Sequence, residues 1–238
     1  MFSTAWRRPD QDLGAVAERA HAAGALYVHQ VDTLAEANRA AEAGADIVVA
    51  QGTEGGGHVG LMATLPLTRM VVRALWSLPV IAAGGIADGA GIAAALVLGA
   101  DGALLGTRFL ATVESPLPEG YKRAIVASDG HDTLLTEIPD IARGETWPGA
   151  FSRARRNAFI SQWLGREGEL RRSRRDAQAG LQAARAAGDA EHGSLLIGQD
   201  AGLVDAIEPA GPLVERLVAE AEAALRSRST LLETARGR

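Results

Sequence analysis

The first half of the chain repeats one pattern: an alanine-rich segment of helical character, a glycine, and a short apolar run. It occurs as "AHAAGALYVHQ", "AAEAGADIVVAQ" and "AALVLGADGALLGT", around Gly24, Gly44 and Gly99. Each glycine stands where a helix would end in a left-handed cap, which glycine adopts without a Cβ penalty. A fourth unit, "RALWSLPVIAAGG", has Leu78 and Pro79 in place of the glycine. The pattern predicts helices that alternate with strands.

The apolar runs are continuous rather than alternating, which is typical of strands buried on both faces of a parallel sheet. They are Leu26–Val28, Ile47–Ala50, Val80–Ala83 and Ala103–Leu105, with a further fragment at Phe2–Trp6. We therefore expect successive right-handed βαβ units. A closed barrel of eight units typically takes roughly 250 residues, and a doubly wound sheet has fewer strands. The pattern alone leaves both α/β folds open.

The alternation stops at about residue 115, and the remainder of the chain reads as largely helical. The predicted helical segments there are Tyr121–Ser128, Ser152–Ala187 and Pro212–Arg226. Because the chain opens in mid-pattern, and a half barrel would expose two strand edges, we expect an N-terminal portion to be missing. We expect residues 1–115 to form the sheet-containing part and residues 116–238 to form a helical segment packed on it.

Composition narrows the functional classes. The 238 residues are 47% apolar and 22% charged, as in soluble globular proteins, and the net charge of −5 does not favour polyanions. The absence of cysteine excludes disulfides, thiolate nucleophiles and Cys-ligated metals, and we predict no metal site. With no signal peptide or long apolar stretch, we expect a cytoplasmic protein that meets no membrane. The arginine-rich stretch is interpreted as a solvated helix face rather than as a nucleic-acid-binding surface. Its arginines are Arg153, Arg155, Arg156, Arg171, Arg172, Arg174 and Arg175.

Three consecutive strand ends are rich in glycine. They are "QGTEGGGH" from Gln51 to His58, "AAGGIADG" with Gly84 and Gly85, and "LLGTRF" with Gly106 and Thr107. Any one of these loops could be a simple turn. Ligands of parallel α/β folds bind at such ends, however, and glycines let backbone N–H groups approach an anion closely. Since neither a P-loop nor a G-x-G-x-x-G motif occurs, the three loops together favour a mononucleotide-like, phosphate-bearing ligand.

Among the five histidines, His58 is the strongest candidate for chemistry, because a neutral imidazole can take or give a proton near neutral pH. The alternative is that His58 only hydrogen-bonds backbone within its own loop. His29 could point into a barrel mouth from the end of its strand. His21, on a predicted helix, is expected to be solvated, and His131 and His192 lie in polar loops.

Long ordered stretches resemble the nitronate monooxygenase family, once called 2-nitropropane dioxygenases. They are "HQVDTLAEANRAAEAGADIVVAQGTEGGGHVG", "PVIAAGGIADGAGIAAALVLGADGALLGTRFLATVESP", "YKRAIVASDGHDTLLTEIPD" and "GQDAGLVDAIEPAGPLVERLVAEAEAALR". The resemblance runs through nearly all of the chain and is weakest between residues 165 and 195. It implies a TIM barrel of the (β/α)8 type that binds FMN without a covalent bond. Residues 1–115 would then be the C-terminal part of an FMN-binding barrel lacking its N-terminal strands.

The resemblance also implies roles for individual residues. Gln51 and Gly56 would lie beside the flavin, and the Thr107 hydroxyl would be an additional donor to its phosphate. The backbone N–H groups that would hold the phosphate belong to Gly85, Leu104, Leu105, Gly106 and Thr107, and the neighbouring glycines Gly57 and Gly84 complete the candidate set.

The catalytic base is where the chain departs from the family pattern. Many members carry it in a Phe-His-Phe-Gly motif, whereas "FSTAWRRPD" places Ala5 or a neighbour there. The chemistry would then use His58, or would act on substrates that arrive already deprotonated.

The activity implied first is oxidation of alkyl nitronates by O2, through FMN, to a carbonyl compound and nitrite. The same family includes flavin-dependent enoyl-ACP reductases and NADH:quinone reductases, which gives a second hypothesis. A third is a truncated, catalytically silent relative, favoured by the mid-pattern start and the missing strand histidine. The expected partners are a small-molecule substrate and O2, and the protein could form a homo-oligomer.

Overall fold

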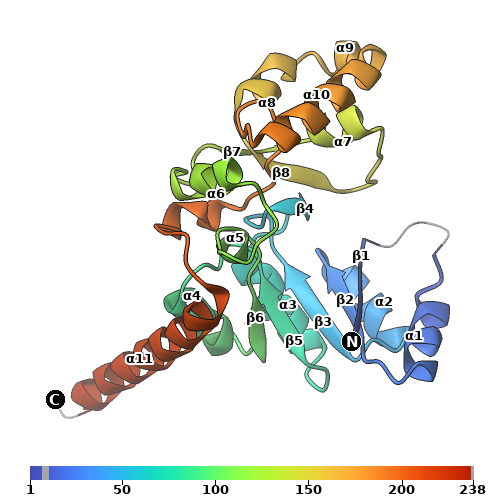
Figure 1. Cartoon of the computed structure of the whole chain (residues 1–238). Coiled ribbons are helices and arrows are strands. Elements are labelled where there is room, and N and C mark those ends of the chain that lie inside the picture. Colours follow the sequence, from blue (N-terminus) through green and yellow to red (C-terminus); the bar gives the residue numbers. More distant parts are fainter. Residues whose placement is uncertain (7–10, 237–238) are drawn as a thin grey trace.

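A parallel sheet of five strands forms the centre of the protein (Figure 1). The computed structural model describes residues 1–6 and 11–236, with side chains as far as residue 227. The strands are β1 (Phe2–Ala5), β2 (Tyr27–Val31), β3 (Ile47–Gln51), β5 (Val80–Ala83) and β6 (Gly102–Leu104), in the order β1-β2-β3-β5-β6. All four strand pairings are parallel, which confirms the prediction from the continuous apolar runs.

Helices alternate with the strands in this half, as the sequence pattern predicts. They are α1 (Leu13–Ala22), α2 (Leu34–Glu42), α3 (Thr64–Ala74), α4 (Gly89–Val97) and the short α5 (Thr107–Leu110). The Asp88 carboxylate caps α4 by accepting from the Gly91 N–H at 2.7 Å. Gly24, Gly44 and Gly99 have φ of +69°, +91° and +94° after α1, α2 and α4, as the glycine pattern predicts.

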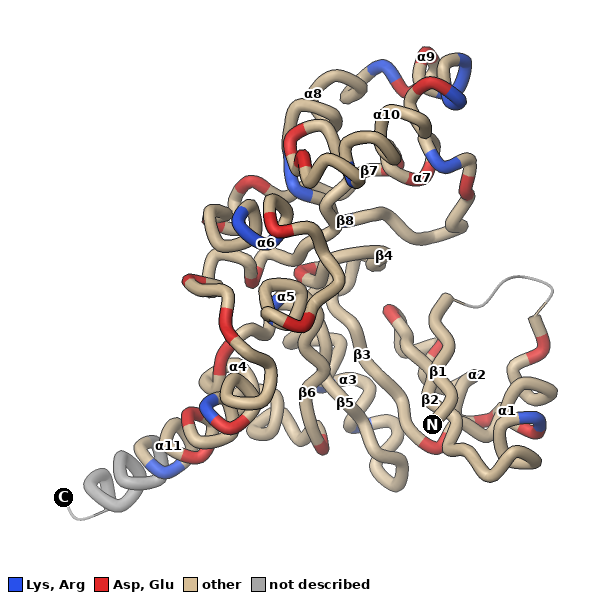
Figure 2. The backbone as a smooth tube through the Cα atoms, in the orientation of Figure 1, with Lys and Arg blue, Asp and Glu red and all other residues tan. Residues whose placement is uncertain are grey.

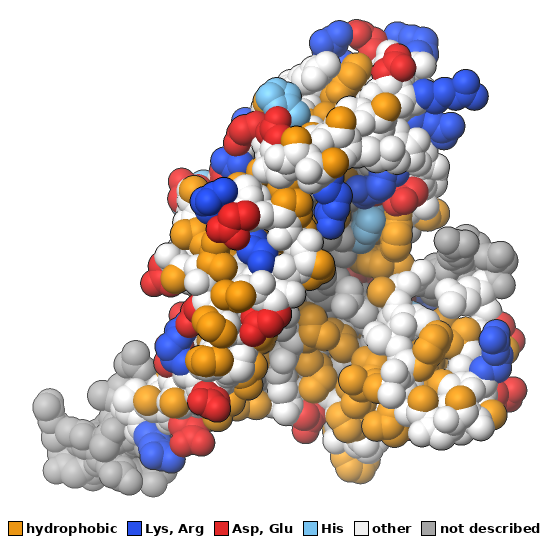
Figure 3. Space-filling view, viewed as in Figure 1, with side chains coloured by type: hydrophobic (Ala, Val, Ile, Leu, Met, Phe, Trp, Pro, Cys, Tyr) orange, Lys and Arg blue, Asp and Glu red, His pale blue; other side chains and the backbone are white. Residues whose placement is uncertain are grey.

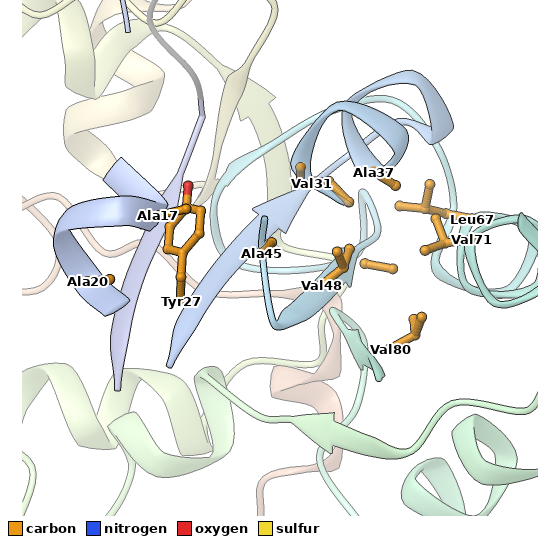
Figure 4. Close-up of a cluster of buried hydrophobic side chains, with 12 residues drawn as sticks. Ala17, Ala20, Tyr27, Val31, Ala37, Ala45, Val48, Leu67, Val71 and Val80 are labelled. Carbon is orange, nitrogen blue, oxygen red and sulfur yellow. The ribbon is translucent and has the colours of Figure 1, made fainter. Parts of the chain in front are cut away.

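Small and β-branched side chains pack the helices against the sheet. In the largest cluster, Val48 and Val80 of the strands face Leu67 and Val71 of α3, and Tyr27 lies beside Ala17 of α1 (Figure 4). Alanines of α1 and α2 complete the cluster and allow the helices to approach closely. Val28, Val49 and Ala83 form a second cluster, so successive residues of one strand are buried on both faces. Double-sided burial is the reason that these runs lack polar residues.

A second, antiparallel sheet corrects the prediction that residues 116–238 are helical. It consists of β4 (Gly57–Val59), β8 (Phe151–Arg155) and β7 (Thr133–Thr136), in the order β4-β8-β7. The predicted helix from Ser152 therefore begins as a strand. Its arginines mislead because they bind within the fold: Arg153 donates to the Thr53 carbonyl at 2.7 Å, and Arg155 donates to Asp132 at 2.9 Å.

The remaining elements of the described chain are helices. They are α6 (Glu119–Val126), α7 (Ile138–Arg143), α8 (Ala158–Trp163), α9 (Glu167–Arg172), α10 (Arg174–Ala187), the 3-10 helix η1 (Gln199–Leu203) and α11 (Ala210–Arg236). Helices α7 to α10 gather with β7 and β8 at one end of the molecule, whereas α11 extends from the other end (Figure 1). Helix α11 packs on α4, where Glu220 accepts from the Gly89 N–H at 3.1 Å. Over the described residues, no helix combines the length and apolar character needed to cross a membrane.

Candidate functional site

The carboxyl ends of β3, β5 and β6 meet at one cavity of about 170 Å³. The register brings them together, because Gln51 pairs with Ala83, and Ala83 pairs with Leu104. The predicted cofactor-binding residues that line the cavity are Gln51, Gly56, Gly57, Gly84, Gly85, Leu104, Gly106 and Thr107. Leu105 is the exception, since it packs beside Ala82 and Ile86 in the core cluster under α4.

The cavity wall between β5 and α4 depends on glycine. Gly84 and Gly85 have φ of +93° and +72°, which side chains disfavour. A Cβ on Gly84 would lie 2.8 Å from the Gly52 carbonyl oxygen, so the two loops touch through their backbones. A Cβ on Gly106 would meet nothing within 4 Å, so this residue borders open space. Within the described residues, the N–H groups of Gly85, Gly106 and Thr107 donate to no backbone carbonyl.

Glu54 holds the glycine loops in place, a role that sequence reasoning missed. Its carboxylate accepts from the Thr64 N–H at 2.9 Å and from the Thr64 hydroxyl at 2.8 Å. The same hydroxyl lies 3.0 Å from the Gly84 carbonyl oxygen. Glu54 and Thr64 therefore tie the loop after β3 to the loop after β5. A second such link orients Gln51, whose side-chain carbonyl accepts from the Gln30 amide.

The segment that contains η1 forms the opposite wall. The Thr107 hydroxyl accepts from the Gly198 N–H at 2.9 Å and lies against the Asp200 carboxyl, so it also contributes to hydrogen bonding within the protein. Asp200 lines the cavity and is 5% exposed. Burial raises the pKa of its carboxyl to about 6, although the bond with Thr107 acts in the other direction. The only sequence signal for this wall was the stretch "GQDAGLV" within the family resemblance.

His58 lies on β4, next to Gly57 of the cavity wall but outside the cavity lining. Its Nε2 is 2.9 Å from Asp140 Oδ1, and its ring stacks on Trp147 with centroids 3.8 Å apart. The Ser152 hydroxyl donates to Asp140 Oδ2 at 2.9 Å. His58 thus bonds a carboxylate 82 residues away rather than the backbone of its own loop.

The Asp140 carboxylate is the centre of this cluster. Burial disfavours its ionised form, but hydrogen bonds from His58, Ser152 and Arg143 together hold its pKa below the ordinary value. An ionised Asp140 accepts a hydrogen bond from the Nε2–H of His58 and so leaves Nδ1 as the basic nitrogen of the ring. Asp140, Ser152 and Trp147 were not identified as site residues from the sequence, because nothing in the sequence indicates that they meet His58.

Replacing Asp140 with asparagine is expected to lower the free energy of unfolding by roughly 3 kcal/mol, because breaking a buried ion pair leaves its partner uncompensated. Denaturant unfolding at pH 7 measures this. The pKa of the Asp140 carboxyl is lower in the folded than in the unfolded protein. The contribution of the ionised carboxylate to the free energy of unfolding is therefore complete above about pH 5 and decreases as the pH falls below about 4. Asp189→Asn, at an exposed pair with His192, is the control and should cost less than about 1 kcal/mol. Equal losses in both variants would contradict a special role for Asp140.

The other candidates lie apart from the cavity. His29 is buried within the sheet, where its Nδ1 is 2.7 Å from the Thr4 hydroxyl, and burial lowers its pKa. His21 is an exposed partner of Asp46. Residues 7–10 of the stretch "FSTAWRRPD" lie outside the described residues. Ala5 lines another hollow of about 640 Å³, which it shares with Trp147, so the end of β1 faces the stacking partner of His58.

Comparisons with known proteins agree with this architecture. The nitronate monooxygenase family model matches residues 3–220. A nitronate monooxygenase of Paraburkholderia phytofirmans is 38% identical over 83% of this chain and 55% of its own length. A Mycobacterium tuberculosis protein, (3aS,4S,5R,7aS)-5-hydroxy-7a-methyl-1-oxo-octahydro-1H-indene-4-carboxyl-CoA dehydrogenase, is 34% identical over 94% of this chain and 72% of its own length. This chain thus spans only about half of the first of these relatives.

The solved structure of FabK from Thermotoga maritima has a similar fold. It superposes with a TM-score of 0.83 at 33% identity, over 96% of this chain and 70% of that one. The likeness confirms the predicted α/β fold of the TIM-barrel type. Together with the family match over residues 3–220, it shows that the chain belongs to the nitronate monooxygenase family of oxidoreductases.

Proposed function

We propose that the protein is an FMN-dependent oxidoreductase that oxidises alkyl nitronates with O2 to a carbonyl compound and nitrite. The observation that carries the proposal is the shared cavity at three strand ends, where the N–H groups of Gly85, Gly106 and Thr107 have no hydrogen-bond partner among the described residues. Membership of the nitronate monooxygenase family supports the reaction class. A small-molecule substrate and O2 are the partners that this function requires.

The residues fit the phosphate-bearing end of FMN. Unpaired amides at glycines suit an anion, because they donate without a side chain in the way. At about 170 Å³ the cavity is smaller than the roughly 300–1,000 Å³ of a pocket that encloses a whole ligand. It would therefore hold the phosphate end, with Gly84, Gly85, Gly106 and Thr107 as the surrounding residues. Gln51, Gly56 and Gly57, at the β3 side, are the residues we place beside the ring.

The chain's own contribution to the reaction is orientation and proton transfer. Bound FMN supplies the electron-accepting chemistry and the reaction with O2. Asp140 holds the Nε2 of His58, and Trp147 covers one face of the imidazole, so the ring is fixed in one orientation. When the substrate arrives as the neutral nitroalkane, Nδ1 of His58 is available to accept the proton from the carbon that bears the nitro group, which gives the nitronate that is oxidised. Gln30 fixes the Gln51 amide at the edge of the site.

Anaerobic mixing of the FMN-loaded protein with an alkyl nitronate tests the proposed function. We expect the flavin absorbance near its visible maximum to bleach, and admission of O2 to restore it while nitrite accumulates. NAD(P)H without nitronate should leave the spectrum unchanged. A spectrum that does not respond to the nitronate would rule this activity out, and a protein that stays colourless after incubation with FMN would favour the silent relative.

A second candidate is the reduction of a thioester or a quinone by NAD(P)H. A hollow of about 600 Å³ beside residues 144–146 is lined by arginines at the junction of α9 and α10, where positive charge gathers in Figures 2 and 3. These are Arg171, Arg172, Arg174 and Arg175, and none of them forms an ion pair with a described residue. Such a hollow suits a phosphate-bearing substrate, and one relative is named as a CoA dehydrogenase. Bleaching of the flavin by NAD(P)H alone would favour this candidate.

A further inference from the structure

We propose that Asp200 binds the anionic end of the cavity's ligand in its protonated form, so that binding takes up one proton from solution. The inference rests on the proposed function, in which the phosphate group of FMN occupies the cavity between Gly85, Gly106 and Thr107. It assigns to Asp200 a role as a hydrogen-bond donor in cofactor binding.

The position of Asp200 gives the first argument. Its side chain lines the same cavity as Gly106 and Thr107 and is 5% exposed. The Thr107 hydroxyl bonds the carboxyl, whereas Oδ1 has no hydrogen-bond partner among the described residues. A buried oxygen without a partner is costly in the ligand-free protein. Because Asp200 lines the cavity, a ligand there would lie against this carboxyl.

The surroundings of Asp200 offer no positive charge. Burial raises its pKa, and no ionised neighbour contributes to the shift. The charged groups on α5, on α6 and in the loops beside η1 are engaged elsewhere. Arg108 bonds Glu208, Lys122 donates to the Val113 carbonyl, and Glu54 accepts from Thr64. Arg123 pairs with Glu119, and Asp129 accepts from the His131 N–H.

An ionised Asp200 and a phosphate would repel each other in so small a space. The repulsion disappears if the carboxylate takes a proton from water, because the acid then donates an O–H bond to a phosphate oxygen. One O–H bond forms on the carboxyl, and no other bond is made or broken. In the ligand-free protein the Asp200 carboxyl has a pKa of about 6, so it is ionised at higher pH. Binding of one ligand at higher pH then takes up nearly one proton. The affinity for FMN should then fall by about tenfold per pH unit above pH 6.

Isothermal titration of the full chain with FMN tests the inference. Titrations at pH 7.5 in two buffers with different ionisation enthalpies give the number of protons taken up, and flavin fluorescence gives Kd between pH 6 and 8.5. We expect uptake of nearly one proton by the natural protein and a Kd that rises about tenfold per pH unit. Asp200→Asn, which keeps a donor but cannot titrate, should lose this uptake and bind more tightly than the natural protein at pH 8.

Asp205→Asn is the matched control, since Asp205 is exposed and lies outside the cavity lining. The Asp205→Asn variant should take up the same number of protons as the natural protein. If Asp200→Asn fails to fold, Asp200→Ser provides a second variant that cannot titrate at this position. The phosphate's own second ionisation, with a pKa of about 6, affects all the proteins equally and so cancels in the comparison. Equal uptake by the natural protein and both Asp200 variants would overturn the inference while leaving the FMN proposal intact. Absence of FMN binding by every protein at every pH would overturn both.

Discussion

Replacing His58 with alanine is expected to slow anaerobic reduction of the flavin by a nitroalkane by about 10²–10⁴-fold, the usual contribution of a general base. The imidazole is held between the Asp140 carboxylate and the Trp147 ring, so only its Nδ1 remains to take a proton. Stopped-flow absorbance of the FMN-loaded protein measures the rate. Flavin reduction by the preformed nitronate should be slowed far less by the substitution, because the nitronate has no proton to lose.

His192→Ala is the control for this experiment. His192 also bonds an aspartate, with Nδ1 2.7 Å from Asp189, but its side chain is 67% exposed, compared with 13% for His58. The flavin of the His192→Ala variant should be reduced by the nitroalkane as fast as that of the natural protein. If His58→Ala reduced the flavin as fast as His192→Ala, His58 would be a structural residue of β4 and not the base.

Replacing Gly106 with valine is expected to weaken FMN binding by roughly 100-fold, because hydrogen bonds to a charged group contribute about 1.5–3 kcal/mol each. A side chain at Gly106 would enter the space beside its own N–H and keep the phosphate away from it. The backbone accepts the change, since φ is −104° and a Cβ would meet nothing within 4 Å. Titration of the ligand-free protein with FMN, followed by fluorescence, gives the affinity.

Gly211→Val provides the comparison that separates binding from folding. Gly211 is also an exposed glycine whose added Cβ would meet nothing within 4 Å, but it lies in α11, away from the cavity. Both variants should unfold within about 0.5 kcal/mol of the natural protein, as surface substitutions usually do. Unaltered FMN affinity in Gly106→Val would show that the phosphate is not held at this strand end.

The parallel sheet could be predicted because its signals are local. The left-handed glycines at 24, 44 and 99 and the apolar runs after them depend on neighbours within a few positions. The antiparallel sheet has no such signal. Strand β4 is three residues of a glycine-rich loop, and its partner β8 carries arginines whose charges are bonded inside the fold. Only the contact between the two segments makes either of them a strand.

The same distinction applies to the site. The glycines of the cavity are visible in the sequence, because loops after consecutive strands share one edge of a parallel sheet. Asp200 and Asp140 belong to stretches that resemble the family, but their contacts, like those of Trp147, are visible only in the structure. Leu105 shows the converse: it belongs to the glycine-rich strand end that the sequence reveals, but its side chain packs against the core cluster under α4.

The long-range pairing of β4 has a consequence for the order in which the protein is made. On the ribosome, the strands of the parallel sheet can associate soon after they emerge, since each neighbour follows within a short interval of translation. His58 must wait for Ser152, 94 residues later, and Gly56 must wait for the backbone at Ile197, against which it lies. A nascent chain therefore carries a formed sheet well before the cavity at its strand ends is complete.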